Sequence, residues 1–431
     1  MLLLLMLKGK EELGGVWGVD SKELVTKMMW LSSESGGENS KGSRMTVHPM
    51  IGQQLVFSNT ENHFILKKNH NFTPSRLMSY SSHHALAKRA CDHFSNSPTP
   101  FHNCATIMSK LDAAGYTRLH EDTPFKGAIK ANGRYYYTRN TSTIVAFLVG
   151  GKYDPSSDNT PGGFKIIGGH TDSPNLRIKP HSKRSSNGCT QLSVECYGGG
   201  LWETWFDRDL SVAGRVMVRD ADGKMIRQQL VKIDRPLIRV PSLCIHLKTG
   251  EERAAFKYNK EEHLQPVLAG EVKSALTGEK RSSPDDASDA SDADQWVAGH
   301  EPMLMQAVAE ELKIDVKQIV DFELMCYDTQ DAALGGMNNE FLYSARLDNQ
   351  GTCFVCTEAL VQYDLERLKT EVDVSMVCLF DHEEVGSASQ CGAGSPIMSE
   401  AVRRVVSAMT KDPHATEDAL QIALRKSFCF R

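Results

Sequence analysis

The chain has 431 residues, of which 40% are hydrophobic and 24% are charged, and its formal net charge is −5 at pH 7. A chain of this length can form two or three domains with a sizeable core, and the composition is typical of a soluble globular protein. The acidic balance argues against nucleic acid as a partner, and no apolar stretch is long enough to span a membrane.

The N-terminal segment begins MLLLLMLKGKEE. No basic residue precedes its short apolar run and acidic residues follow it, so a cleaved secretory signal is not expected. The chain up to residue 80 is rich in Ser, Asn, Gly and His. We predict an extension over 1–80 that is disordered or carries an organelle-targeting signal. Eleven scattered cysteines favour free thiols and a cytoplasmic location.

Residues 81–175 have the pattern of an α/β domain. Two helical stretches flank SNSPTP, where Pro98 and Pro100 interrupt the helix. The segments GRYYYTRN and STIVAFLVGG predict strands, and FKIIGGH predicts a short strand that ends at His170.

Residues 176–340 differ, because short β-rich segments separated by turns predominate. The segments CTQLSVECYGG, SVAGRVMVRD, QQLVKIDRPLIRV and SLCIHLKT all predict strands. The acidic run SSPDDASDASDADQ is too polar to pack, so a disordered loop is expected over 279–295. We predict a β-rich domain over 176–340, inserted into an α/β domain that 81–175 and 341–431 form together.

The α/β pattern resumes after residue 340, with a helix at CFVCTEALVQYDLERL and a strand at DVSMVCLF. Cys353 and Cys356 have CxxC spacing, but no second pair completes a zinc site, so we interpret them as thiols of a packed helix. The fold class is therefore α/β, with a mixed, largely parallel sheet covered by helices. In such sheets, functional groups gather at the carboxyl ends of strands.

Three strand ends carry polar groups: His170 and Asp172 in GGHTDSPN, Asp348 in ARLDNQG, and Glu383 and Glu384 in FDHEEVGS. Each pattern alone is weak, since a lone His-Asp pair is more often a surface hydrogen bond. Together they form a plausible ligand set for Zn²⁺, Co²⁺ or Mn²⁺. Asp172 is placed to support the ring of His170, and a neighbouring glutamate to act as general base on water.

Longer motifs are similar to those of one family. The segments are NSPTPFH, GGHTDSPNLRIKP, VECYGGGLWETWFDRDLSVAGRV, RPLIRVPSLCIHL, DTQDAALGG, NEFLYSARLDN and FDHEEVGS. Over about residues 83–428 the chain resembles the aspartyl aminopeptidases, which are dinuclear-metal exopeptidases. The resemblance implies a dinuclear zinc aminopeptidase-like α/β domain, interrupted by a dimerisation domain over 176–340. It also implies release of unblocked N-terminal Asp or Glu from peptides.

The resemblance assigns roles to residues at the three strand ends. It implies two divalent metal ions, first of all Zn²⁺, with Co²⁺ and Mn²⁺ as alternatives. His170 would bind one metal, Asp348 would bridge both, and Glu384 would bind the second. Glu383 would be the general base and would contact the substrate, with Asp172 as a further catalytic residue beside His170.

His246, in CIHL, matches a histidine that the family contributes to the active site of a neighbouring subunit. The resemblance thus implies that His246 is a catalytic and substrate-binding residue of a homo-oligomer, a dodecamer in the family. Read without the resemblance, His246 would be a polar residue near a strand end. Neither nucleic acid nor a membrane is expected as a partner.

The family pattern also has an aspartate and a histidine ligand downstream of ALRKSFCFR, the segment with which this sequence ends. A C-terminally truncated catalytic domain, with one ligand fewer for each metal, is therefore expected. Two hypotheses stay open: an active aminopeptidase, and a catalytically dead family member that acts only as an assembly subunit. A related dinuclear peptidase with another side-chain preference is a further alternative.

Overall fold

The computed structural model of the protein describes residues 76–157, 161–220, 222–270, 296 and 298–430. The predicted loop 279–295 and residues 1–75 of the predicted extension lie outside these ranges. The chain divides into two units, Met1–Ala87 and Lys88–Arg431, and α3 (Arg76–Ser95) runs through the boundary. Within the described ranges, no helix combines the length and apolar character needed to cross a membrane.

The second unit contains a mixed sheet with the strand order β1-β2-β3-β13-β4-β14. Its strands are β1 (Thr117–Arg118), β2 (Arg134–Arg139), β3 (Thr143–Val149), β4 (Phe164–His170), β13 (Val374–Phe380) and β14 (Phe428–Phe430). The pairs β1–β2, β13–β4 and β4–β14 are parallel, whereas β3 is antiparallel to both β2 and β13. Because β4 and β13 run in parallel, both end at the same edge of the sheet, with His170 opposite Phe380.

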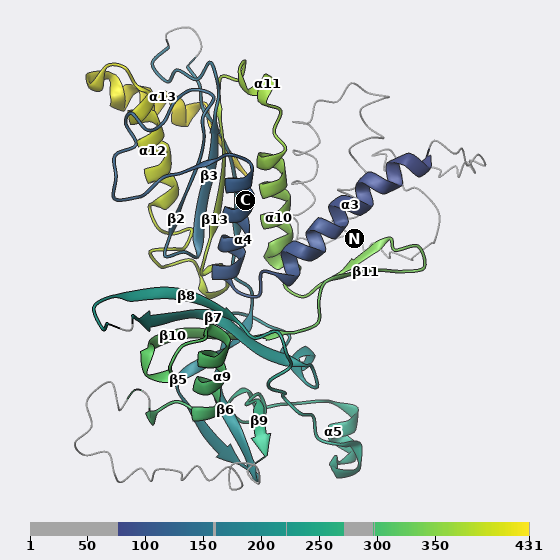
Figure 1. Cartoon of the computed structure of the whole chain (residues 1–431). Helices are drawn as coiled ribbons and strands as arrows, with labels where there is room; N and C mark the ends of the chain where they lie inside the picture. Colours follow the sequence, from purple (N-terminus) through teal and green to yellow (C-terminus); the bar gives the residue numbers. More distant parts are fainter. Residues whose placement is uncertain (1–75, 158–160, 221, 271–295, 297, 431) are drawn as a thin grey trace, which may run out of the picture. The chain divides into compact units, whose positions relative to one another are not determined.

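Helices cover both faces of this sheet, which confirms the predicted α/β fold class. They are α4 (Pro100–Ala113), α10 (Leu347–Val361), α12 (Ile397–Met409) and α13 (Thr416–Arg425). Successive strand residues point to opposite faces, so Met376 packs in the core under α12 and α13, and Val377 in the core under α4 and α10 (Figure 1). Cys353 and Cys356 are buried thiols of α10, as the sequence predicts.

Between β4 and β13, the chain forms an antiparallel sheet with the order β8-β7-β10-β5-β6-β9. Its strands are β5 (Asn175–Ser186), β6 (Cys189–Tyr197), β7 (Leu210–Arg219), β8 (Ile226–Lys232), β9 (Val267–Gly270) and β10 (Ile319–Asp328), and α9 (Pro302–Leu312) packs on it. Leu304 and Val308 of α9 share a buried core with Val212 and Val216 of β7. The inserted domain predicted over 176–340 includes these elements except Asn175, the first residue of β5, and its boundaries and dimerisation role stay predictions.

Short elements complete the described chain. They are η1 (Trp202–Trp205), η2 (Ile245–Leu247), α5 (Gly250–Ala254), α6 (Lys260–His263), η4 (Val316–Gln318), β11 (Ala333–Gly335), β12 (Phe341–Tyr343), α11 (Leu365–Leu368), η5 (Glu383–Val385) and η6 (Pro413–Ala415). The strand predicted at SLCIHLKT is wrong, because this segment forms the 3-10 turn η2. Its apolar residues Leu243, Ile245 and Leu247 are 50%, 59% and 69% exposed, so they face no sheet core.

Candidate active site

The parallel pairing of β4 with β13 brings His170 close to the two adjacent glutamates. After β13 the backbone turns sharply at His382, whose φ is 62°, and again at Gly386, whose φ is 95°. Glu383 and Glu384 occupy the 3-10 turn η5 between these two positions. One potential ligand atom from each of His170, Glu383 and Glu384 lies within 4.8 Å of the others.

Asp348, at the start of α10, extends this cluster. His170 Nε2 lies 3.3 Å from Asp348 Oδ1 and 3.8 Å from Glu383 Oε2. The backbone around Asp348 is tied to the end of β4, since the Ser173 hydroxyl donates to the Asp348 carbonyl over 2.8 Å and the His170 amide donates to Asn349 Oδ1 over 3.1 Å. The Asp348 side chain itself is 84% exposed. One imidazole and three carboxylates therefore converge, a donor set that suits Zn²⁺ or a similar divalent ion.

Asp172 is buried beneath the cluster and connects its parts. His170 Nδ1 lies 3.0 Å from the Asp172 carbonyl oxygen and 3.4 Å from its carboxylate Oδ1. The same carboxylate accepts the backbone N–H groups of Glu383 and Glu384 over 3.2 and 3.1 Å. It also accepts a 2.7 Å hydrogen bond from the Tyr197 hydroxyl. Tyr197 is not predicted as a site residue from the sequence, and it lies at the end of β6 in the antiparallel sheet.

The charges of the cluster influence one another strongly. Burial disfavours the imidazolium form of His170, but the hydrogen bonds that its ring donates to the Asp172 and Asp348 carboxylates outweigh burial and raise its pKa to about 10. Burial and the neighbouring carboxylates raise the pKa of Glu384 to about 7. The hydrogen bond to His170 is the main cause that lowers the pKa of Asp348. Ionising several carboxylates this close together costs free energy, and a bound metal ion would compensate their negative charge.

Gly198 forms a wall of the site directly against Glu384. Its φ is +78°, and a Cβ atom added to it would lie 2.8 Å from Glu384 Cβ and 3.3 Å from Glu384 Oε2. The backbone at this position therefore approaches Glu384 as closely as only glycine allows. Both Tyr197 and Gly198 of the motif VECYGGGLWETWFDRDLSVAGRV thus belong to the site.

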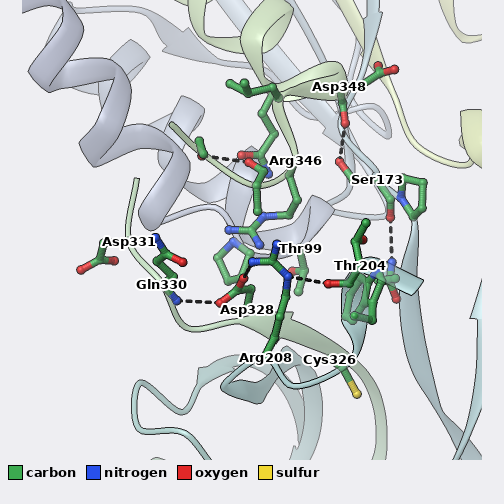
Figure 2. A pocket seen from close by; sticks show the side chains of 18 of the residues that line it. Thr99, Ser173, Thr204, Arg208, Cys326, Asp328, Gln330, Asp331, Arg346 and Asp348 are labelled. Carbon is green, nitrogen blue, oxygen red and sulfur yellow. Dashed lines mark hydrogen bonds and ion pairs between the residues drawn. The ribbon is translucent and has the colours of Figure 1, made fainter. Parts of the chain in front are cut away.

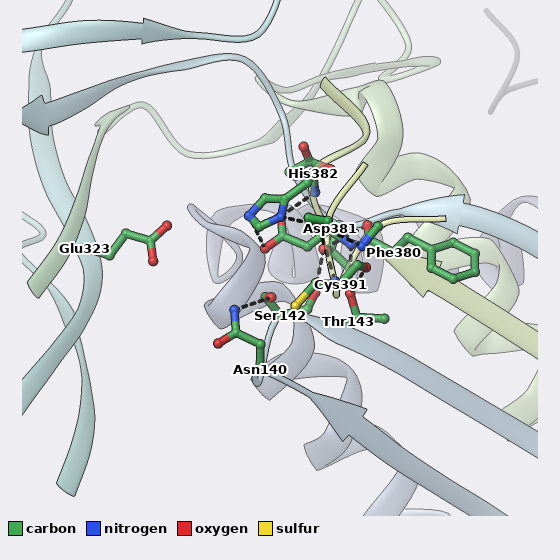
Figure 3. Close-up of polar contacts among 12 residues, drawn as sticks. Asn140, Ser142, Thr143, Glu323, Phe380, Asp381, His382 and Cys391 are labelled. Atoms are coloured by element: carbon green, nitrogen blue, oxygen red, sulfur yellow. Dashed lines mark hydrogen bonds and ion pairs between the residues drawn. The ribbon is translucent and has the colours of Figure 1, made fainter. Parts of the chain in front are cut away.

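A network of polar contacts holds Asp381 and His382, the two residues that precede the glutamate turn (Figure 3). His382 Nδ1 lies 2.8 Å from the Ser389 hydroxyl oxygen, and His382 Nε2 lies 3.4 Å from Asp381 Oδ2. The Asp381 amide donates to Thr143 Oγ1 over 2.9 Å, and the Thr143 hydroxyl donates to the Cys391 carbonyl over 2.7 Å. These bonds fix the turn, so the side chains of the two glutamates start from a defined backbone.

A cavity of about 560 Å³ lies beside the cluster and includes Arg346 and Asp348 in its lining. Arg208 donates to Asp328 over 2.6 Å within it. Figure 2 shows the Asp348 carboxylate pointing away from Arg346 and from the cavity, while its carbonyl faces Ser173. The cavity therefore shares the backbone of the Asp348 segment but not the ligand atoms of the cluster.

His246 does not join the other predicted site residues. It lies in η2, in an exposed segment. The structure thus brings together His170, Asp172, Asp348, Glu383 and Glu384. The roles predicted for these residues and for His246 stay predictions.

Comparisons with known proteins identify the family. Residues 93–430 match the model of the aminopeptidase I zinc metalloproteases, M18. An aspartyl aminopeptidase of Aspergillus oryzae is 40% identical over 346 residues, which cover 77% of this chain and 68% of the relative.

Solved structures agree with this assignment. In the cryo-EM structure of the Ape4 and Nbr1 complex, the similar chain has a TM-score of 0.72 and 38% identity, with 80% of this chain and 62% of that chain covered. The structure of the S. cerevisiae mApe1 dodecamer gives a TM-score of 0.64 and 25% identity, with 81% of this chain and 71% of that chain covered. The chain belongs to the M18 family of aminopeptidase I zinc metalloproteases, which confirms the predicted metallo-aminopeptidase family.

Proposed function

We propose that the protein is a metallo-aminopeptidase that releases unblocked N-terminal Asp or Glu from peptides. The observation that carries this proposal is the convergence of His170, Glu383 and Glu384, whose potential ligand atoms lie within 4.8 Å of one another. The acidic preference is supported by similarity to aspartyl aminopeptidases such as the A. oryzae protein.

The donor set is suited to hold two divalent ions, Zn²⁺ in the first place. His170 would ligate one ion, Glu384 the other, and the exposed Asp348 carboxylate would bridge them. A divalent ion held there supplies Lewis acidity, which polarises a peptide carbonyl and acidifies water. The compensating charge would also offset the burial and the carboxylate repulsion that raise the pKa of Glu384.

The remaining steps belong to side chains of this chain. Glu383 would accept the proton of the attacking water as a new C–O bond forms at the peptide carbonyl. The same carboxyl group would then deliver this proton to the leaving amine nitrogen as the peptide C–N bond breaks. Asp172 would keep the His170 ring in one orientation through the contacts at Nδ1.

His246 would act in a neighbouring subunit of a homo-oligomer. It lies in an exposed segment and outside the cluster formed by His170, so a role at a site requires another copy of the chain. The mApe1 relative, whose structure is a dodecamer, supports such an assembly. A cytoplasmic location is supported by the eleven scattered cysteines, of which buried ones such as Cys353 and Cys378 are thiols that form no disulfide.

Peptides that differ only in their first residue test the proposed activity. Purified protein supplied with Zn²⁺ should release Asp and Glu from Asp- and Glu-initiated peptides faster than Leu or Ala from otherwise identical peptides. Equal rates for all four would indicate a related aminopeptidase with another preference. Absence of release from every peptide by metal-loaded protein would favour the assembly-subunit hypothesis instead.

A further inference from the structure

We infer that Tyr197 is a positioning residue of the candidate metal centre. From the end of β6 in the antiparallel sheet, its hydroxyl holds the Asp172 carboxylate in the orientation that fixes both His170 and the glutamate turn. The inference rests on the proposed function, because it assumes that His170 and Glu384 are metal ligands.

The contacts of the Asp172 carboxylate define what Tyr197 controls. Asp172 Oδ2 accepts the Tyr197 hydroxyl over 2.7 Å and the Glu384 amide over 3.1 Å. Asp172 Oδ1 accepts the Glu383 amide over 3.2 Å and lies 3.4 Å from His170 Nδ1. Rotation of the carboxylate would disturb all of these contacts together. The Tyr197 hydroxyl opposes that rotation from the side of the other sheet.

The hydrogen bond between Tyr197 and Asp172 is buried, so its loss would be energetically costly. Asp172 is 1% exposed and Tyr197 is 7% exposed, so water cannot readily replace the phenol as a partner. A buried carboxylate that loses a donor becomes costly to keep ionised and in place. An ionised Asp172 in a fixed orientation in turn keeps the His170 ring nitrogen Nε2 directed at Asp348.

Tyr197 is itself held by a polar row that crosses the antiparallel sheet. The Arg177 guanidinium lies 3.6 Å from the centroid of the Tyr197 ring. Arg177 Nη1 donates to Glu323 Oε1 over 2.9 Å, and Glu323 Oε2 accepts from Arg215 Nη2 over 3.0 Å. These residues come from β5, β10 and β7, which are neighbours in the sheet.

The other end of the row also reaches the α/β part of the chain. Arg215 Nη1 donates to Asn140 Oδ1 over 2.8 Å, and its guanidinium lies 4.5 Å from the centroid of the Phe101 ring. The antiparallel sheet is thus tied to the α/β elements at Asn140 and Phe101 as well as at Asp172. The sheet therefore has a defined position from which Tyr197 can orient Asp172.

A second buried tyrosine provides a matched control. Tyr327, in β10, is 4% exposed, and its hydroxyl donates to the Ile233 carbonyl over 2.8 Å. Replacing either tyrosine by phenylalanine deletes one buried hydrogen bond that a phenol donates, to a carboxylate at Tyr197 and to a backbone carbonyl at Tyr327. Only Tyr197→Phe removes a bond to Asp172, so a comparison separates a positioning role from a general loss of stability.

Metal affinity is the decisive measurement. Full-length protein is stripped of metal, and its dissociation constants for Zn²⁺ and Co²⁺ are measured by competition with a chromogenic chelator. We expect Tyr197→Phe to weaken binding by about 10–100-fold, as for other residues that orient metal ligands, and to alter the visible absorption spectrum of bound Co²⁺. Tyr327→Phe should leave both unchanged. Wild-type affinity in Tyr197→Phe, or equal weakening in Tyr327→Phe, overturns the inference.

His170→Ala distinguishes failure of this inference from failure of the proposed function. If His170→Ala binds Zn²⁺ as tightly as the wild type, the proposed centre is wrong and the inference falls with it. If His170→Ala loses affinity while Tyr197→Phe does not, only the role of Tyr197 is overturned.

A second experiment tests the same inference without metal. Amide hydrogen exchange in the metal-free protein should be faster at Glu383 and Glu384 in Tyr197→Phe than in Tyr327→Phe, because their acceptor Asp172 is less well held. Equal exchange in the two variants also overturns the inference.

Discussion

His170, the last residue of β4, is the register partner of Phe380, the last residue of β13. Because the two strands are parallel neighbours, the turn that follows Phe380 begins beside the His170 side chain. Glu383 and Glu384 lie in that turn, and a Glu383 oxygen is 3.8 Å from His170 Nε2. The geometry of one strand pair therefore assembles most of the candidate active site.

The stability of the metal-free protein should depend on pH through Glu384. Its pKa is about 7 in the folded protein, against an ordinary value of 4.5. Between these values the folded state keeps a proton that the unfolded state releases, so stability should fall as pH rises from 4.5 to 7. Urea unfolding at several pH values should show this fall in wild type and not in Glu384→Gln. Glu366→Gln, which changes an exposed glutamate of α11, is the control and should retain the fall.

His170 should add a second fall at higher pH. Its pKa is about 10 in the folded protein, against an ordinary value of 6.5. The stabilisation from protonated His170 is complete below pH 6.5 and is lost as pH rises to about 10. Urea unfolding of the metal-free wild type from pH 6.5 to 10 should therefore show declining stability that is absent in His170→Gln. Zn²⁺ competes with this proton, so Zn²⁺ affinity should rise over the same range. Equal pH dependence in both proteins would contradict the prediction.

Gly198→Ala should weaken metal binding. A Cβ atom there would lie 2.8 Å from Glu384 Cβ, and the positive φ of +78° adds backbone strain of about 1–2 kcal/mol. Gly188 has φ +71°, and among the described residues, its chain neighbours aside, no atom lies within 4 Å of the added Cβ, so it offers a control with similar strain and no clash. Gly198→Ala should lose at least as much stability in urea as Gly188→Ala, because it adds a clash to the strain, and only Gly198→Ala should lose Zn²⁺ affinity. Equal Zn²⁺ affinity in Gly198→Ala and Gly188→Ala would mean that Glu384 can shift away from the added Cβ without weakening metal binding.

A pair of inactive variants can test the role of His246 between subunits. His246→Ala and Glu383→Gln should each have low activity alone, because each lacks one component of every site. Co-expressed in mixed oligomers, the two variants should recover part of the activity, since an intact His246 from one subunit can meet an intact Glu383 in another. His120→Ala, at another exposed histidine, should stay fully active. A mixture as inactive as its components would argue against the shared site.

Site residues that lie at or just after the end of an apolar strand could be predicted from the sequence. His170 and Glu384 are predictable because each lies within four residues of the end of an apolar run, and such runs end at one edge of a parallel pair. Tyr197 was missed because its hydrogen bond to Asp172 joins two different sheets, and no local pattern encodes that approach. The close contact of Gly198 with Glu384 depends on the same packing.

The strand prediction at SLCIHLKT is wrong for a related reason, because tertiary contacts again decide the structure. The apolar residues Leu243, Ile245 and Leu247 alternate with polar or small ones, which is typical of a strand. In the structure these three side chains are exposed and the segment forms a 3-10 turn. Local alternation indicates an apolar face but cannot specify what that face contacts. The fold of the central sheet was predictable because its apolar runs are buried on both faces.

The central claim is that the His170 cluster is a hydrolytic metal centre with Glu383 as general base. The most direct measurement is kcat for an Asp-initiated peptide, with Zn²⁺ content determined on the same samples of wild type, Glu383→Gln and the surface control Glu366→Gln. We predict that Glu383→Gln lowers kcat by about 10²–10⁴-fold while it keeps its Zn²⁺ and nearly the wild-type KM, and that Glu366→Gln matches the wild type. Wild-type kcat in Glu383→Gln would contradict the claim.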